Sequence, residues 1–164
     1  MPVDFLTLLR RDHTDLHREL TSLIDPDATT RELRSALDGV RLGLTAHAGA
    51  EDLVLGRIDE VPALRVVLAQ TRRAHLAQEG ALASLVAAMP RTRTWLQRAL
   101  HLRELLECHM EHLERHLASA LREHLPGGAY AALAGAFATE RLRQLTTLAP
   151  SGPVLSIPPA RVSR

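Results

Sequence analysis

The sequence predicts an all-α protein: an up-down antiparallel four-helix bundle with a short extra C-terminal helix and an irregular tail. Three observations lead to this fold class. Apolar residues recur every three or four positions through four long segments, breaks marked by proline separate these segments, and no stretch shows the strict alternation of a half-buried strand. Long helices joined by short connections pack as antiparallel neighbours.

The four predicted helices follow one another from the N-terminus. The first covers about residues 3–24 and ends at DPDATT, and the second covers about 30–59 and ends before VPAL. The third begins near Pro62, a residue that suits the first turn of a helix, and extends to about residue 89. The fourth covers about 92–125 and stops at PGG, so we expect the bundle to occupy residues 1–126.

The remaining sequence divides into two parts. The segment AYAALAGAFATERLRQL predicts a weaker fifth helix, an accessory helix within residues 127–148. Residues 149–164 are rich in proline, and we expect them to form a flexible tail.

The composition argues against several classes of protein. With 20 basic and 19 acidic residues, the formal charge of +1 gives no electrostatic case for binding nucleic acid or an anionic membrane. The single cysteine excludes an internal disulfide framework. The first residues carry charges where a signal peptide needs an apolar run, and no stretch approaches the roughly 20 apolar residues that span a bilayer. We therefore expect a soluble cytoplasmic protein, and its oligomeric state stays open.

Polar residues interrupt the apolar stripe of every predicted helix near its middle. His13 lies in the first stripe, His47 and Glu51 in the second, and His75 in the third, while several histidines lie in the fourth. Burying a polar group without a partner costs several kcal/mol, and a buried carboxylate has to be paired, ligated or protonated. An interruption shared by four helices indicates one common site.

The spacing of these residues indicates a metal site. Four pairs lie four residues apart, which brings both side chains to one helix face: His13/His17, His47/Glu51, His75/Glu79 and His112/His116. Imidazole and carboxylate groups are the usual ligands of non-haem iron, and they also serve zinc and manganese.

The fourth helix offers two alternative ligand pairs within the segment HMEHLERH. Its three histidines, at positions 109, 112 and 116, fall on one side of a helix. Counting along the helices from their predicted ends places His112 roughly level with His47, so we favour His112 with His116. The alternative is His109 with Glu114, which supplies a carboxylate.

The predicted ligand set therefore comes from all four helices. Its members are His13, His47, Glu51, His75, His112 and His116, with Glu79, His109 and Glu114 as alternatives. Asp52, next to the central carboxylate, looks like a residue of the solvated helix face.

These motifs resemble the hemerythrin-like, His-His-Glu cation-binding domains of bacteria. The pattern of that family is a His on helix one, His-x-x-x-Glu on helix two, a His on helix three and His-x-x-x-Glu on helix four. His13, the HAGAE motif from His47 to Glu51, and His75 match the first three elements. The fourth element departs from the pattern, because no histidine there is followed by Glu four residues later.

The resemblance implies a bundle that holds two non-haem irons, with zinc or manganese as less favoured ions. It also implies a small partner, namely a diatomic gas such as oxygen or nitric oxide, or peroxide. Binding, sensing, storage and detoxification are the implied roles, with peroxide removal as the implied enzymatic activity. The alternative is a structural-metal or metal-free helical interaction module.

Overall fold

A computed structural model describes residues 4–148 of the chain. Every regular element in this range is helical and no strand occurs in it, so the prediction of an all-α fold is confirmed. None of these helices combines the length and the apolar character that crossing a membrane requires. The predicted flexible tail, residues 149–164, lies outside the described range.

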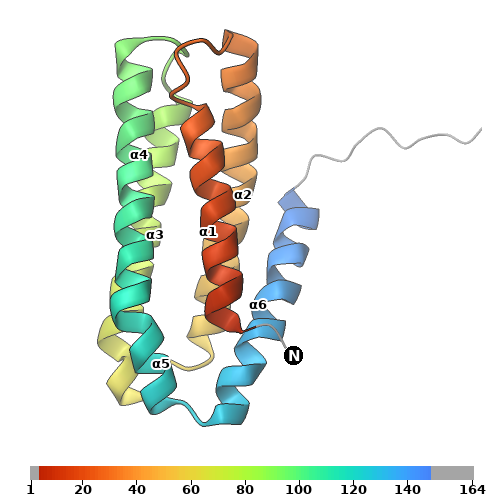
Figure 1. The fold of residues 1–164 in the computed structure, drawn as a ribbon, viewed down its shortest axis with the longest axis vertical. Coiled ribbons are helices and arrows are strands. Elements are labelled where there is room, and N and C mark those ends of the chain that lie inside the picture. Colours follow the sequence, from red (N-terminus) through yellow and green to blue (C-terminus); the bar gives the residue numbers. More distant parts are fainter. Residues whose placement is uncertain (1–3, 149–164) are drawn as a thin grey trace, which may run out of the picture.

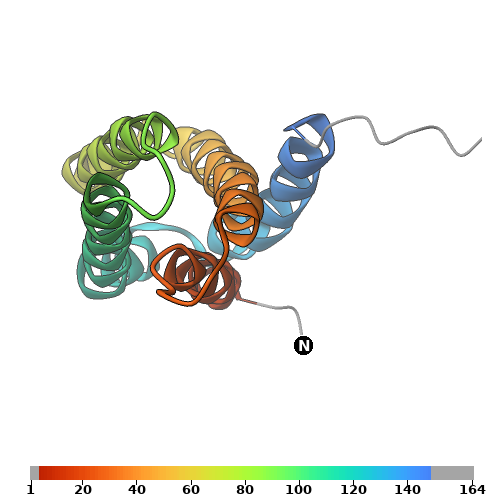
Figure 2. The same cartoon turned by 90° about the horizontal axis from the view of Figure 1, so that it is seen from above.

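Four long helices lie side by side (Figure 1) and, viewed from above, surround a common interior (Figure 2). Short loops join α1 to α2, α2 to α3 and α3 to α4. A π-helical turn then leads from α4 into the short α5, and α6 follows. The bounds are Phe5–Ser22 for α1, Thr30–Gly56 for α2, Arg65–Val86 for α3 after the 3-10 turn Pro62–Leu64, Arg93–His112 for α4, Leu113–Leu117 for the π turn, Ala118–His124 for α5 and Gly127–Leu148 for α6.

Side-chain caps determine where three of the long helices begin. Asp4 accepts a hydrogen bond from the backbone N–H of Thr7 at the start of α1, and Thr92 caps α4 in the same way. Thr29 and Glu32 form a reciprocal capping box at the start of α2. Because these caps fix each helix start, they also fix the level at which the interior histidines lie.

The interior consists of two apolar clusters. The upper cluster lies toward the α1–α2 and α3–α4 loops and includes Leu16, Leu44, Leu82, Trp95, Leu102 and Leu106. The lower cluster lies toward α5 and includes Leu9, Val54, Leu68, Leu113 and Phe137. Between them in the sequence of each long helix come the buried polar residues: His13, His47, Glu51, Thr71, His75, Gln78 and His109. A polar layer therefore divides the core.

The close approach of α1 and α2 depends on a glycine. A Cβ atom at Gly43 would lie 2.9 Å from Cδ2 of Leu16, closer than real Cβ contacts allow. Gly43 is one turn before His47, and Leu16 is one turn after His13. The missing side chain therefore leaves room for the buried Leu16 side chain where α1 packs against α2 beside these two histidines.

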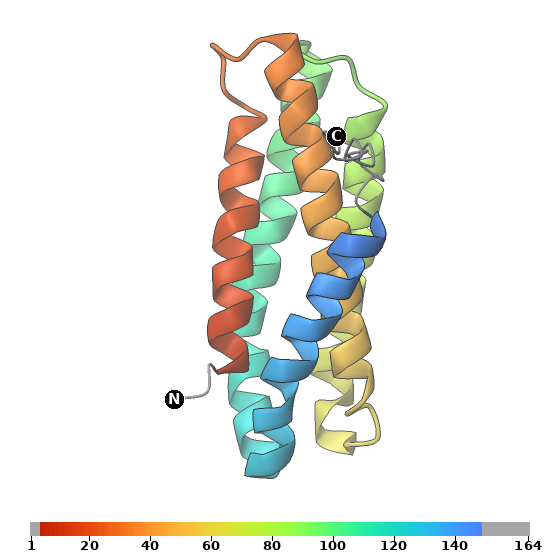
Figure 3. The ribbon, with the colours of Figure 1, turned by 90° about the vertical axis from the view of Figure 1, so that its right-hand side faces the viewer.

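Helix α6 packs mainly against α2, with further contacts to α1, and runs obliquely across α2 in Figure 3. The ring of Phe137 packs edge-on against Phe5, with 5.8 Å between ring centroids. The hydroxyl of Tyr130 donates a hydrogen bond of 2.6 Å to Asp4. The accessory helix therefore covers the seam between α1 and α2.

We expect Leu102→Ala to lower the free energy of unfolding by about 2–5 kcal/mol, because Leu102 is fully buried in the upper cluster. Urea denaturation followed by circular dichroism measures this change. The matched control is Leu100→Ala on the same helix, where the side chain is 38% exposed and the loss should stay below about 1 kcal/mol. Equal losses in the two variants would contradict the assignment of the core face of α4.

Candidate metal centre

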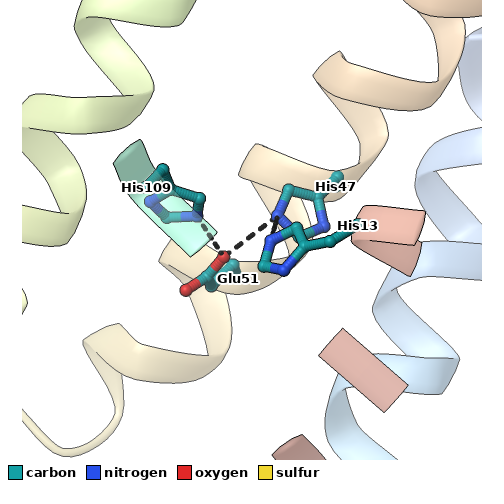
Figure 4. A group of neighbouring side chains, drawn as sticks. All are labelled: His13, His47, Glu51 and His109. Atoms are coloured by element: carbon teal, nitrogen blue, oxygen red, sulfur yellow. Dashed lines mark hydrogen bonds and ion pairs between the residues drawn. The ribbon is translucent and has the colours of Figure 1, made fainter. Parts of the chain in front are cut away.

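Four side chains from three helices converge in the polar layer. His13 comes from α1, His47 and Glu51 from α2, and His109 from α4, and all four are buried. One ligand atom from each lies within 4.8 Å of every other, an arrangement that can hold a metal ion. Figure 4 shows the Glu51 carboxylate between His109 and the pair formed by His13 and His47.

The carboxylate of Glu51 is the centre of this arrangement. Its Oε2 atom lies 3.1 Å from Nε2 of His47, one helical turn earlier on the same helix. The same oxygen lies 3.3 Å from Nε2 of His75 on α3 and 3.4 Å from Nε2 of His109. His75 therefore joins the group, so that all four long helices contribute to it.

The four imidazoles form two close pairs. The ring centroids of His13 and His47 are 4.6 Å apart, and those of His75 and His109 are 4.7 Å apart. Between the pairs, the centroid separations are 5.3 Å from His13 to His109 and about 6 Å from His47 to each ring of the other pair. Glu51 contacts members of both pairs, so the site has two imidazole groups joined by one carboxylate.

Several polar atoms of this group lack hydrogen-bond partners within the described chain. Nε2 of His13 and Nε2 of His47 lie 3.0 Å apart and are hydrogen-bond partners of each other. Both oxygens of Glu51, Nε2 of His75 and both ring nitrogens of His109 are buried without a partner. Buried polar groups in native proteins are almost always satisfied. A cation beside Glu51 would satisfy the carboxylate and the Nε2 atoms of His75 and His109, so the residues fit a metal ion.

Two further carboxylates orient the histidine rings from outside. Nδ1 of His47 lies 2.8 Å from Asp12, and Nδ1 of His75 lies 2.8 Å from Asp52. When Nδ1–H donates to a carboxylate, Nε2 is directed inward and is available to a metal. This carboxylate–histidine arrangement is typical of metal-ligating imidazoles.

Helix α6 supports one of these carboxylates directly. The guanidinium of Arg141 donates two hydrogen bonds of 2.7 Å to the two oxygens of Asp12. Such bidentate pairs fix geometry as well as charge. A chain of contacts therefore connects the accessory helix to His47 through Asp12.

The protonation of the group follows from these contacts. Burial would raise the pKa of Asp12, but hydrogen bonding with His47 and Arg141 lowers its pKa to about 2. Burial would likewise raise the pKa of Glu51, but the surrounding imidazoles of His109, His47 and His75 hold its pKa well below the usual value. Both carboxylates are therefore ionised at neutral pH.

The imidazoles differ from one another in protonation. Burial, reinforced by the charge of nearby His47, lowers the pKa of His13 well below its ordinary value. Burial also lowers the pKa of His109. For His75, burial acts in the same direction, but hydrogen bonding with Asp52 and contact with Glu51 outweigh it and raise the pKa to about 9. In the metal-free protein, protons at His75 therefore balance part of the buried negative charge.

The structure revises the predicted ligands of the fourth helix. His109 lies in the cluster, whereas His112 is half-buried outside it and His116 is exposed. The rings of His112 and His116 pack against each other, with centroids 5.3 Å apart. Counting from the two N-caps agrees with this: His47 lies 18 residues after Thr29 and His109 lies 17 after Thr92, whereas His112 lies 20 after Thr92. His112, the predicted ligand, therefore lies three residues, or nearly one helical turn, beyond His109.

The two alternative carboxylates also lie outside the cluster. Glu79 is exposed on α3, at the edge of a groove beside His75. Glu114 lies in the π-helical turn and forms an ion pair of 3.0 Å with Arg10 at the surface. Within residues 4–148, Glu51 is therefore the one carboxylate of the cluster.

The residues that sequence reasoning missed are the supports of the rings. The sequence pattern assigns Asp52 to the solvated helix face and gives no role to Asp12 or Arg141. Asp12 directly precedes His13 and Asp52 directly follows Glu51, and this proximity to ligands was the available signal. Asp12, however, bonds a histidine on another helix, and Arg141 approaches from α6, so their partners depend on packing.

Comparison with known proteins gives no relatives: no family model, no curated protein and no solved structure matches the chain. What the site can do is therefore argued from its geometry.

The raised pKa of His75 predicts a pH-dependent stability for the chelator-treated, metal-free protein. A folded-state pKa of about 9 exceeds the ordinary value of 6.5, so protonated His75 stabilises the fold fully below about pH 6.5 and progressively less as the pH rises through 9. Urea denaturation should show that the stability difference between wild type and His75→Gln shrinks by on the order of 2–3 kcal/mol from pH 6 to 9.5. A difference that stays constant over this range would contradict the proposed interactions of His75.

Proposed function

We propose that this protein binds non-haem iron at the cluster around Glu51 and responds to oxygen, nitric oxide or peroxide. The observation that carries the proposal is the buried carboxylate whose two oxygens lack hydrogen-bond partners while imidazoles from three helices lie within 3.4 Å of it. Burying such a group without a cation costs free energy, whereas a bound cation pairs with the carboxylate and the imidazoles and offsets this cost. Imidazole and carboxylate ligands suit iron, and they also suit zinc and manganese.

Two ions are the proposed content of the site. The pairing of His13 with His47 and of His75 with His109 supports this number, because Glu51 contacts both pairs and a carboxylate can bridge two metal ions. The arrangement of histidines around a His-x-x-x-Glu motif agrees with the hemerythrin-like resemblance. An up-down bundle of that kind is the architecture we propose for α1 to α4.

The small number of protein ligands supports a role in binding small molecules. Four imidazoles and one carboxylate leave positions on two metal ions for water or another ligand. Non-haem iron supplies redox chemistry at such open positions and binds dioxygen, nitric oxide or peroxide there.

The aromatic residues argue against a radical relay. Trp95 donates its indole N–H to the backbone of Leu23 in the upper cluster, and Tyr130 donates its hydroxyl to Asp4. Neither side chain contacts the histidine cluster. This arrangement favours reversible binding, sensing or peroxide removal over oxygenase chemistry.

Metal content tests the proposal. Protein reconstituted anaerobically with Fe²⁺ should hold about two irons per chain and change its visible spectrum when oxygen or peroxide is added. Glu51→Gln keeps the side-chain shape but removes the central charge, so we expect iron content to fall at least tenfold. Elemental analysis of the desalted protein measures the content.

The matched control is Glu111→Gln, which alters an exposed carboxylate on α4 and should leave iron content unchanged. A wild-type protein that takes up a single zinc and no iron would favour the structural-metal alternative. Full iron loading of Glu51→Gln would show that the site lies elsewhere.

The fourth helix allows a second test of the same site. His109→Ala removes a buried imidazole beside Glu51 and should lower iron content or affinity by about 10- to 100-fold. His116→Ala removes an exposed ring and should change neither quantity by more than about twofold. Anaerobic titration with Fe²⁺ measures both, and the opposite ranking would restore the His112/His116 pair as the ligands.

A further inference from the structure

A groove between α2 and α3 lies directly beside the cluster. It has a volume of about 250 Å³, and His75 forms part of its wall. Asp52, which orients the His75 ring, also lines the groove. Since Nε2 of His75 lies 3.3 Å from Glu51, a single side chain separates the groove from the centre of the site.

Apart from His75, whose Nδ1 is hydrogen-bonded to Asp52, the polar lining of this groove consists of two carboxylates, a hydroxyl and an amide. Asp52 and Glu79 supply two carboxylates, and Thr45 supplies a hydroxyl. Gln78 also lines the groove, is 1% exposed, and has a buried Oε1 atom without a hydrogen-bond partner. No arginine lines this groove, whereas four further cavities among the described residues each include at least one. This chemistry favours a cation.

The opposite approach to the cluster is closed. The cavity beside His13, between α1 and α4, has a volume of only about 10 Å³. The ion pair of Arg10 with Glu114 lies at this cavity, so the carboxylate there is already paired and offers no free charge to a cation. A volume near 10 Å³ is just enough for one water, whereas 250 Å³ accommodates a hydrated ion.

We propose that the α2–α3 groove is a binding site for hydrated divalent cations and the route by which they enter the cluster. This inference rests on the metal binding proposed above. Asp52 and Glu79 attract the hydrated ion, and the free oxygen of Gln78 replaces a water of its shell. His75 then lies between the ion and Glu51.

The rate of metal uptake tests this route, with Co²⁺ as the probe because its visible absorption reports coordination. Stopped-flow mixing of metal-free protein with Co²⁺ at low ionic strength should show uptake about three- to tenfold slower in Glu79→Arg than in wild type. The ratio of the two uptake rates should approach one in about 0.5 M salt, because salt at this concentration screens the charges. The final Co²⁺ content should be the same in both proteins, since Glu79 lies outside the cluster.

A control and a second variant separate charge from access. Glu111→Arg makes the same change of charge on an exposed part of α4 and should take up Co²⁺ at the wild-type rate. Ala48→Phe narrows the groove from α2 and should slow uptake at low and high salt alike. Equal rates for wild type, Glu79→Arg and Ala48→Phe, with normal final content, would overturn the route and leave the proposed function standing. A wild-type protein that binds no Co²⁺ or Fe²⁺ at equilibrium would overturn both.

Discussion

The burial of one carboxylate is the constraint on which the rest of the structure depends. Glu51 is completely inaccessible to solvent, and its charge is balanced by imidazoles on the same helix and on two others. Buried charges persist only when they are paired or bind metals. The apolar clusters above and below Glu51 exclude water. This strengthens the interactions of its carboxylate and raises the free-energy cost of losing any one of them. The position of Glu51 therefore fixes the level at which the four long helices meet.

Helix α6 has a larger part in this arrangement than its place outside the four helices suggests. Arg141 holds Asp12, Asp12 holds the ring of His47, and His47 contacts Glu51. The ring of Phe137 lies 6.0 Å from that of His47, so α6 also supplies an apolar wall. Any displacement of α6 would leave Asp12 without its cationic partner and loosen the orientation of His47. The accessory helix and the candidate metal centre therefore form one structural unit.

The fold and the inner half of the site could be predicted from the sequence because both depend on periodicity. A polar residue such as His47 in a stripe of leucines can only face the core, whatever the neighbouring helices do. The predicted starts of the second and fourth helices, about 30 and about 92, agree with the observed caps to within one residue. His109 and His112 are only three residues apart, and a residue count along two helices does not resolve so small a difference in level, because tilt and loop height also contribute. The supports of the rings could not be predicted, because Asp12 and Arg141 meet only through the packing of α1 against α6.

The outer carboxylates also bear on the net charge of the proposed site. Two divalent ions bound by four neutral imidazoles and Glu51 alone would leave three positive charges in a buried site. Asp12 and Asp52 each lie 2.8 Å from a ring nitrogen and bring two negative charges to its edge, while Arg141 returns one positive charge. An anionic ligand such as hydroxide, peroxide or superoxide would offset part or all of this excess of about two positive charges. An inner set with more carboxylates would lack the excess. Because Glu51 is the one carboxylate of the cluster among the described residues and Glu114 is held at the surface by Arg10, the proposed site is biased toward binding small anions.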